Sequence, residues 1–111
     1  MMNIVERDQN GVTVFELDGR VDTQGAVDLD MALQAAVSGG QNKMVLDMAQ
    51  VSYISSAGLR TLADVVTANR EAGGDLKLVG VNRRVLRVLR IIGFDKFFAI
   101  HDTVAAAIAN F

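Results

Sequence analysis

Two adjacent serines, Ser55 and Ser56, stand where the residue pattern changes from that of a strand to that of a helix. The apolar run Met44–Leu46 is typical of a strand buried on both faces, and helical spacing of apolar residues begins at Leu59. The start of a helix presents unpaired N–H groups and a partial positive charge, which suit a capping hydroxyl or a phosphate group. On the local pattern alone, Ser56 is either a helix cap or a phosphorylation site. Ser55 is interpreted as a cap or as a loop residue that forms a hydrogen bond, with modification of its hydroxyl as the minor alternative.

The segment between this strand and the helix is predicted to be a short loop. Asp47 ends the apolar run, and its carboxylate is interpreted as a hydrogen-bond acceptor that shapes the loop rather than as a metal ligand. Gly58 has no side chain, so it is expected to let a partner or a nucleotide phosphate approach the backbone closely. A phosphate on Ser56 is expected to meet the free N–H groups of residues Gly58–Arg60.

The chain before this strand is predicted to form an antiparallel hairpin followed by a helix. Strands are expected over Asn3–Gln9 and Val12–Leu17, joined by Asn10-Gly11, a dipeptide that favours a two-residue hairpin turn. Thr23 is predicted to be the N-cap of the helix, since helical spacing starts soon after it. The buried stripe of this helix is Leu29, Ala32, Leu33, Ala36 and Val37, and the helix ends at Gly39-Gly40.

Helices and strands alternate through the rest of the chain. A second helix is predicted from about Ala57 to Ala72, then a strand over Leu76–Val81 and a third helix capped by Asn82. The third helix is expected to bury Val85, Val88, Leu89 and Ile92. A short edge strand is predicted at Phe97, Phe98 and Ile100. A last helix, capped by Asp102 or Thr103, is expected to place on one face Val104, Ala107, Ile108 and Phe111. Core filling is expected of Met31, Met44 and Met48.

This order of elements predicts an α/β fold with a mixed sheet of about four to five strands, an N-terminal antiparallel hairpin and about four helices. The chain has 111 residues, the size of one domain, so a single domain is expected over residues 1–111. No apolar run approaches the ~20 residues that a membrane span needs. The chain has no cysteine, which excludes disulfides and thiol chemistry and fits a reducing cytoplasm.

Other polar residues each allow a structural and a functional interpretation. Arg83, Arg87 and Arg90, with Arg84 beside them, form either a solvated helix face or a docking patch for an acidic partner. Nucleic acid is a weaker alternative, because the formal net charge is −2 and no aromatic residue interleaves with the arginines. His101 is the only histidine, and the nucleophile pattern G-x-S-x-G is absent, so neither an enzymatic role nor a cofactor is expected.

The segment Asp47–Leu59, DMAQVSYISSAGL, together with the order of elements, resembles the STAS domain family. The residues that match its pattern are Asp47, Tyr53, Ser56, Gly58 and Leu59. The segment Leu17–Asp22 is similar to the family's L-x-G-x-[LV]-D stretch before the first helix. The chain departs from the pattern at Ser55, where the family has an acidic residue, and at Ala57.

The resemblance implies a bacterial anti-sigma factor antagonist in the cytoplasm, without enzymatic activity of its own. In such proteins the serine at the place of Ser56 is phosphorylated by a partner that is both serine kinase and anti-sigma factor. Binding of this partner to the unmodified chain, release on phosphorylation and reversal by a phosphatase would follow. The partner surface is expected to comprise Asp22, Thr23, Ser55, Ser56, Gly58 and Arg60. The alternative is a constitutive scaffold in a stress-signalling or transport complex.

Overall fold

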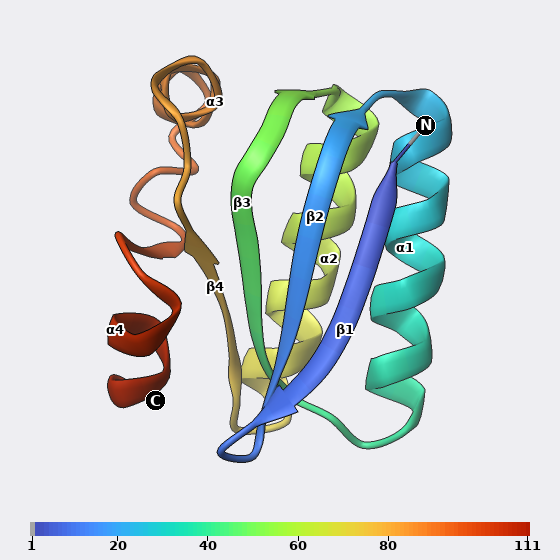
Figure 1. Ribbon diagram of the computed structural model, residues 1–111, viewed down its shortest axis with the longest axis vertical. Helices are drawn as coiled ribbons and strands as arrows, with labels where there is room; N and C mark the ends of the chain where they lie inside the picture. The colour runs from blue at the N-terminus through green and yellow to red at the C-terminus, as the bar shows by residue number, and fades with distance from the viewer. Residues whose placement is uncertain (1) are drawn as a thin grey trace.

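A mixed five-stranded sheet in the order β1-β2-β3-β4-β5 forms the centre of the computed structural model, which describes residues 2–111 (Figure 1). The strands are β1 (Asn3–Gln9), β2 (Val12–Val21), β3 (Lys43–Ile54), β4 (Asp75–Val79) and β5 (Ala99–His101). β1 and β2 are antiparallel, and every other neighbouring pair is parallel. The predicted hairpin and parallel sheet are confirmed, and both turn residues, Asn10 and Gly11, have positive φ angles of 55° and 79°.

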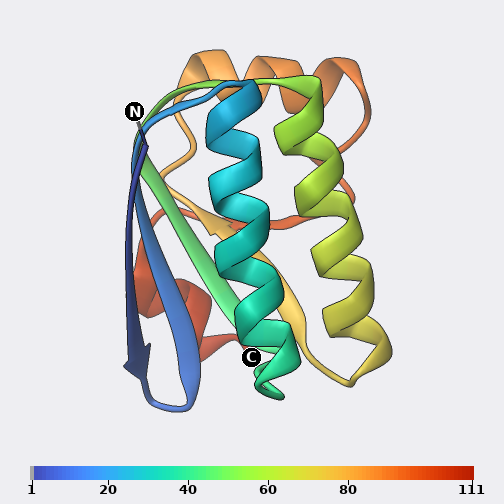
Figure 2. The ribbon, with the colours of Figure 1, turned by 90° about the vertical axis from the view of Figure 1, so that its right-hand side faces the viewer.

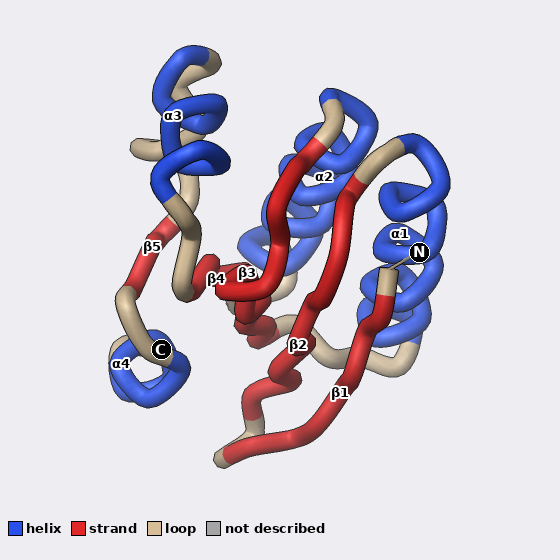
Figure 3. Tube along the Cα trace, turned by 45° about the horizontal axis from the view of Figure 1, so that its top comes forward, coloured by secondary structure: helices blue, strands red, loops and turns tan. Residues whose placement is uncertain are grey.

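Four helices surround this sheet: α1 (Thr23–Ser38), α2 (Ser56–Glu71), α3 (Arg83–Ile91) and α4 (Val104–Ala109). Figure 2 shows α1 and α2 side by side on one face, while α3 runs across the end of the sheet at which both of these helices begin. In Figure 3 the sheet separates α1 and α2 from α4, which lies on the opposite face. The four predicted helices and the mixed sheet are therefore confirmed.

Two apolar clusters hold these layers together. The larger one lies between the sheet and α1, α2 and α3, and its fully buried members include Phe15, Leu46 and Leu62. The smaller one lies under α4 and consists of Val12, Val14, Val45, Val79 and Ala107. β2 and β3 therefore bury side chains on both faces, which explains why Met44–Leu46 is a continuous apolar run.

The structure corrects the prediction that a loop begins after Asp47. β3 continues to Ile54, because its second half still pairs with β2 through Gly19↔Val51 and Val21↔Ile54. The register between the two strands shifts twice, between Glu16 and Asp18 and between Gly19 and Arg20 of β2. The Asp47 carboxylate accepts a hydrogen bond from the Ala49 N–H at 3.1 Å. Its predicted role as a hydrogen-bond acceptor is confirmed, although it acts within a strand.

Three apolar residues lie outside the positions predicted for them. Ile92 is the C-cap of α3 and is 46% exposed, because the helix turns its Val85 and Leu89 inward instead. Met31 is 67% exposed on α1 and does not fill the core. Phe111 lies beyond the end of α4, and its ring packs against the Lys77 ammonium group at 4.1 Å from the ring centroid.

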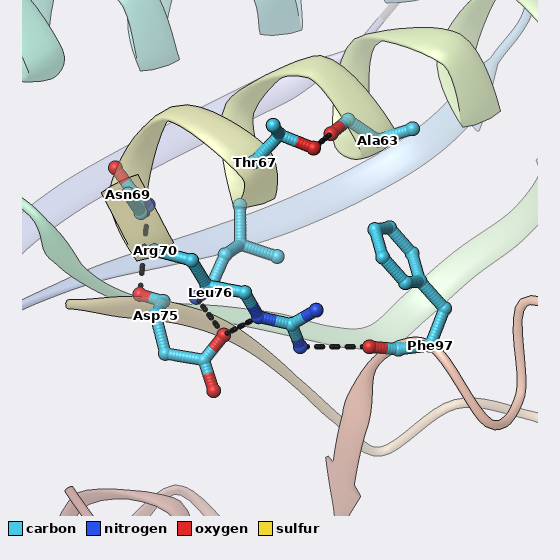
Figure 4. A network of polar contacts seen from close by, with 7 residues as sticks. All are labelled: Ala63, Thr67, Asn69, Arg70, Asp75, Leu76 and Phe97. Atoms are coloured by element: carbon cyan, nitrogen blue, oxygen red, sulfur yellow. Dashed lines mark hydrogen bonds and ion pairs between the residues drawn. The ribbon is translucent and has the colours of Figure 1, made fainter. Parts of the chain in front are cut away.

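Arg70 joins three segments at the far end of α2 (Figure 4). Its guanidinium group donates to the Asp75 carboxylate at 2.9 Å and to the Phe97 carbonyl at 2.7 Å. The same group lies 4.9 Å from the centroid of the Phe97 ring. A single side chain thus ties α2 to the start of β4 and to the segment before β5.

Lys77 is a buried lysine on the face of β4 that α4 covers. Its ammonium group donates to the Ala107 carbonyl at 3.2 Å, and the side chain is 4% exposed. Burial lowers the pKa of Lys77 from its ordinary value of 10.5, while the neighbouring Asp75 carboxylate opposes this shift. The helix α4 is therefore fastened to the sheet by a cation that has lost much of its hydration.

Replacing Arg70 by alanine is expected to lower the free energy of unfolding by about 1 kcal/mol, because two hydrogen bonds from a partly exposed charged group are lost. The matched control is Arg60→Ala on the same helix, because this exposed arginine forms no ion pair with the described part of the chain, residues 2–111. Urea denaturation measures both variants. Equal stability of the two variants would contradict the role assigned to Arg70.

Lys77 makes stability depend on pH in alkaline solution. Its folded-state pKa is lowered, so just below pH 10.5 the unfolded chain binds a proton that the folded chain lacks. The free energy of unfolding of the native chain, minus that of a Lys77→Met variant, is therefore expected to rise as the pH approaches 10.5. Denaturation at a series of pH values measures this difference. Parallel stability curves for the native chain and Lys77→Met would refute the expectation.

Candidate functional site

The first turns of α1 and α2 lie next to each other at one end of the sheet. β2 and β3 are paired as far as Val21 and Ile54, and one of the two helices begins directly after each strand. The Ser55 N–H donates to the Val21 carbonyl at 2.7 Å, which extends the pairing by one more bond. The two connections that the sequence singles out are thereby held together.

Asp22, and not Thr23, is the N-cap of α1. The Asp22 carboxylate accepts a hydrogen bond from the Gly25 N–H at 2.8 Å, and Thr23 is the first residue of the helix. An aspartate satisfies a free N–H and favours the positive end of the helix, so the cap moves one residue earlier than predicted. Both side chains remain exposed, and Asp22 therefore combines a capping role with access from solvent.

Ser55 and Ser56 have different structural roles. The Ser55 hydroxyl accepts from the Gly58 N–H at 3.1 Å, so Ser55 is the N-cap of α2 and its predicted capping role is confirmed. Ser56 is the first residue of the helix and is exposed, while Ser55 is only partly exposed. Because Ser55 already caps the helix, the Ser56 hydroxyl is not needed for that purpose.

Gly58 is buried, and the space that its missing side chain leaves faces the interior. A Cβ at this position would lie 2.6 Å from Val21 Cγ1 and 3.0 Å from Ile54 Cγ1. Glycine is therefore required so that α2 can pack against the ends of β2 and β3. We expected the missing side chain of Gly58 to let a partner approach the backbone. The structure corrects this reason, because the side chains of Val21 and Ile54 fill the space that the missing side chain leaves.

The N–H groups expected to meet a phosphate are partly occupied. The Gly58 N–H donates to Ser55 Oγ, and the Leu59 N–H donates to the Ser55 carbonyl at 3.0 Å. Among residues 2–111, the structure gives the Ser56 and Ala57 N–H groups no such capping bond. An anion at the start of α2 would therefore meet the N–H groups of Ser56 and Ala57, two residues earlier than predicted.

A shallow groove of about 230 Å³ lies between the N-terminal halves of α1 and α2, and it reaches Ala57, the residue after Ser56. Val27 and Met31 of α1 line it and are 49% and 67% exposed, and Ala57 forms its α2 wall. The residues that line the groove are Thr23, Ala26, Val27, Asp30, Met31, Ala57 and Thr61. Val27 was not predicted from the sequence and Met31 was predicted to fill the core, although both residues fall outside the buried stripe of α1, which indicates an exposed position.

Arg20 and Tyr53 form an exposed pair at the same end of the sheet. The guanidinium carbon of Arg20 lies 4.5 Å from the centroid of the Tyr53 ring, and the two residues are partners in the β2–β3 register. Arg20 was not singled out from the sequence, because only the register brings it beside Tyr53. Arg60, which the sequence did single out, is exposed one helical turn beyond Ser56.

The remaining candidates do not form a second site. His101 lies on the edge strand β5, and the Asn82 carboxamide caps α3 as predicted, accepting from the Val85 N–H at 2.9 Å. No group of three histidine, aspartate or glutamate side chains within residues 2–111 is arranged to hold a metal ion. In the same part of the chain, every helix is too short or too polar to cross a bilayer.

Comparison with known proteins agrees with this architecture. Residues 3–107 match the STAS domain family. BtrV of Bordetella bronchiseptica is 35% identical over 102 residues, which cover 92% of this chain and 88% of BtrV. The anti-sigma-F factor antagonist RsfB of Mycobacterium tuberculosis is 28% identical over 111 residues, which cover 98% of this chain and 88% of RsfB.

The fold is also shared with SpoIIAA from Bacillus, whose structure has been determined in the phosphorylated form. The two structures superpose with a TM-score of 0.76 and cover 97% of this chain and 98% of SpoIIAA, at 14% sequence identity. This likeness concerns the fold. The match of residues 3–107 to the family and the 35% identity to BtrV establish that the chain belongs to the STAS domain family.

Proposed function

We propose that the chain is an anti-sigma factor antagonist of the cytoplasm. It binds an anti-sigma factor that is also a serine kinase while Ser56 is unmodified, and it releases this partner when Ser56 carries a phosphate. The observation that carries the proposal is the division of roles between two serines, since Ser55 caps α2 and leaves the exposed Ser56 hydroxyl available. Two similar proteins support the proposal, because RsfB is named an anti-sigma-F factor antagonist and SpoIIAA has a structure in the phosphorylated form.

In this scheme the chain is a single domain over residues 1–111 that is a substrate and a binding protein, and the kinase supplies ATP and its metal. The proposed contact surface is the end of the molecule where α1 and α2 begin, with Asp22, Thr23, Ser55, Ser56 and Arg60 exposed or partly exposed there. Gly58 contributes by shaping this end from inside. A phosphatase acting on phosphorylated Ser56 returns the chain to its binding form.

Phosphorylation is expected to change the surface and to leave the fold intact. A phosphate on Ser56 adds about −1.5 to −2 charges at the positive end of α2, next to the Ser56 and Ala57 N–H groups. Arg60 lies on the same helix face one turn later, where an opposite charge stabilises the modified chain. At an exposed site these interactions favour the folded state by about 0.3–1 kcal/mol.

Release of the partner follows from desolvation. Ala57 lines the groove with Val27 and Met31, so we expect a partner that covers the groove to cover the exposed Ser56 next to Ala57 as well. Burying a doubly charged phosphate without a matching cation is strongly unfavourable, and about 1.4 kcal/mol already weakens binding tenfold. An acidic partner would be repelled in addition, so one phosphate is sufficient to reverse the preference.

Phosphate is expected on Ser56, and not on Ser55, in the protein isolated from its own cells, with an occupancy that changes under stress. The exposed hydroxyl of Ser56 is accessible to a kinase, whereas the Ser55 hydroxyl is engaged with the Gly58 N–H. Peptide mapping by mass spectrometry measures both positions. A chain that stays unmodified under all conditions would point to the constitutive scaffold instead.

Release of the partner is tested by passing an extract of the host cells over immobilised variants of the chain and measuring the retained anti-sigma factor. Ser56→Ala is expected to retain an anti-sigma factor that carries a kinase domain, and Ser56→Asp to retain at least about tenfold less of it. Ser38→Asp is the control, because it adds the same charge at an exposed serine at the other end of α1. Equal retention by the two Ser56 variants would rule out the switch.

Ser55→Ala is expected to lower the free energy of unfolding by about 1 kcal/mol, because the Gly58 N–H loses its acceptor. Ser56→Ala should change it by less than about 0.5 kcal/mol, as is usual for an exposed residue without such a bond. Urea denaturation compares the two variants. A larger loss for Ser56→Ala would show that Ser56 and not Ser55 is the cap.

A further inference from the structure

Helix α3 carries a face made of four exposed arginines. Arg83, Arg87 and Arg90 follow one another at helical spacing on its outer side, and Arg84 lies beside them. The four side chains line a surface depression of about 490 Å³. We refer to Arg83, Arg84, Arg87 and Arg90 as the α3 arginine face.

The positive charges of this face are not neutralised within the fold. The salt bridges recorded among residues 2–111 join Arg7 to Glu16 and Arg70 to Asp75, and none includes an arginine of α3. The chain has a formal net charge of −2, so without these four arginines it would carry −6. Four like charges on one short helix repel one another.

We propose that the α3 arginine face is a docking surface for a carboxylate-rich protein surface, such as a helix with glutamates at i, i+4 and i+7. Every basic residue of α3 is an arginine, the side chain whose planar group pairs with a carboxylate through two parallel hydrogen bonds. Ile91 is 74% exposed next to Arg90 and offers an apolar contact within the charged surface. A charged rim around an apolar contact is typical of protein interfaces.

The structure argues against a membrane as the occupant of this face. A helix that lies in a bilayer surface needs a broad, free apolar side. The apolar side of α3 is already used, because Val85 and Leu89 are buried in the main core. The outward side therefore consists mainly of guanidinium groups, which bind an acidic surface without insertion.

Nucleic acid is also a poor match. The rest of the chain is acidic and would repel a phosphate backbone beyond the length of this nine-residue helix. Phe97, the exposed aromatic ring nearest in sequence to α3, lies under the Arg70 guanidinium group and is not free to stack on a base. A compact acidic protein surface fits the size of the face better.

The face has a fixed position relative to the rest of the molecule. The Asn82 carboxamide caps α3 and also donates to the Val51 carbonyl of β3 at 2.6 Å, which anchors the start of the helix to the sheet. Figures 1 and 2 show α3 at the same end of the molecule as the start of α2. The inference does not depend on phosphorylation of Ser56, because it concerns a different helix and a different chemistry.

Binding of three labelled probes to the purified chain tests the proposal by fluorescence anisotropy and NMR. The first is an alanine-based helical peptide with glutamates at i, i+4 and i+7, compared with the same composition scrambled around the helix. The second is a short DNA duplex, and the third is a vesicle of phosphatidylglycerol and phosphatidylcholine. We expect the spaced peptide to bind at least about fivefold more tightly than the scrambled one and to shift the arginine side-chain resonances of α3.

The variant Arg83→Gln/Arg87→Gln is expected to lose this preference, while Lys43→Glu keeps it. Both variants lower the net charge by the same amount, and Lys43 lies at the opposite end of β3, so a general charge effect is excluded. Both arginines are exposed, and neither forms an ion pair within residues 2–111, so the variant should fold normally, which its thermal denaturation checks. Equal binding of the two peptides, equal loss in both variants, or tighter binding of the DNA or the vesicle would overturn the proposal.

Discussion

The hydrogen bond from the Ser55 N–H to the Val21 carbonyl closes the central strand pair at the end where two helices begin. β2 and β3 must remain in register up to this bond, because the caps of α1 and α2 follow within one residue on each side. Gly58 adds the steric condition, since only glycine lets α2 begin against Val21 and Ile54. The exposed Ser56, the groove between α1 and α2, and the Arg20–Tyr53 pair all owe their positions to this arrangement.

Much of this arrangement was predictable from the sequence. The turn at Asn10-Gly11, the apolar run of β3 and the glycines after α1 and α2 are local signals, and the structure confirms what they predict. The positions of the helices relative to Ser56 follow from the alternation of strands and helices. The STAS family pattern was recognisable because it lies in one continuous segment around Ser56. It can therefore be identified without knowing how the strands pair.

What the sequence could not predict depends on contacts between segments. The extension of β3 beyond Asp47 is stabilised by pairing with β2, which no local pattern reveals. The N-cap of α1 is Asp22 and not the predicted Thr23. Both side chains can accept a hydrogen bond at the start of the helix, and in the structure the Asp22 carboxylate does so. The exposure of Met31 depends on which side of α1 faces the sheet. The role of Gly58 depends likewise on which side of α2 packs against Val21 and Ile54.

The crossover topology has a consequence for a chain that is still being synthesised. β1 and β2 form a local hairpin, whereas β2 and β3 are separated in the sequence by the whole of α1, and such non-local pairing slows folding. α2 must then leave the ribosome before the start of α2 can pack on Val21 and Ile54. A nascent or unfolded copy therefore exposes the two serines without the paired helix ends around them, and an enzyme or partner that reads those ends discriminates between mature and incomplete chains.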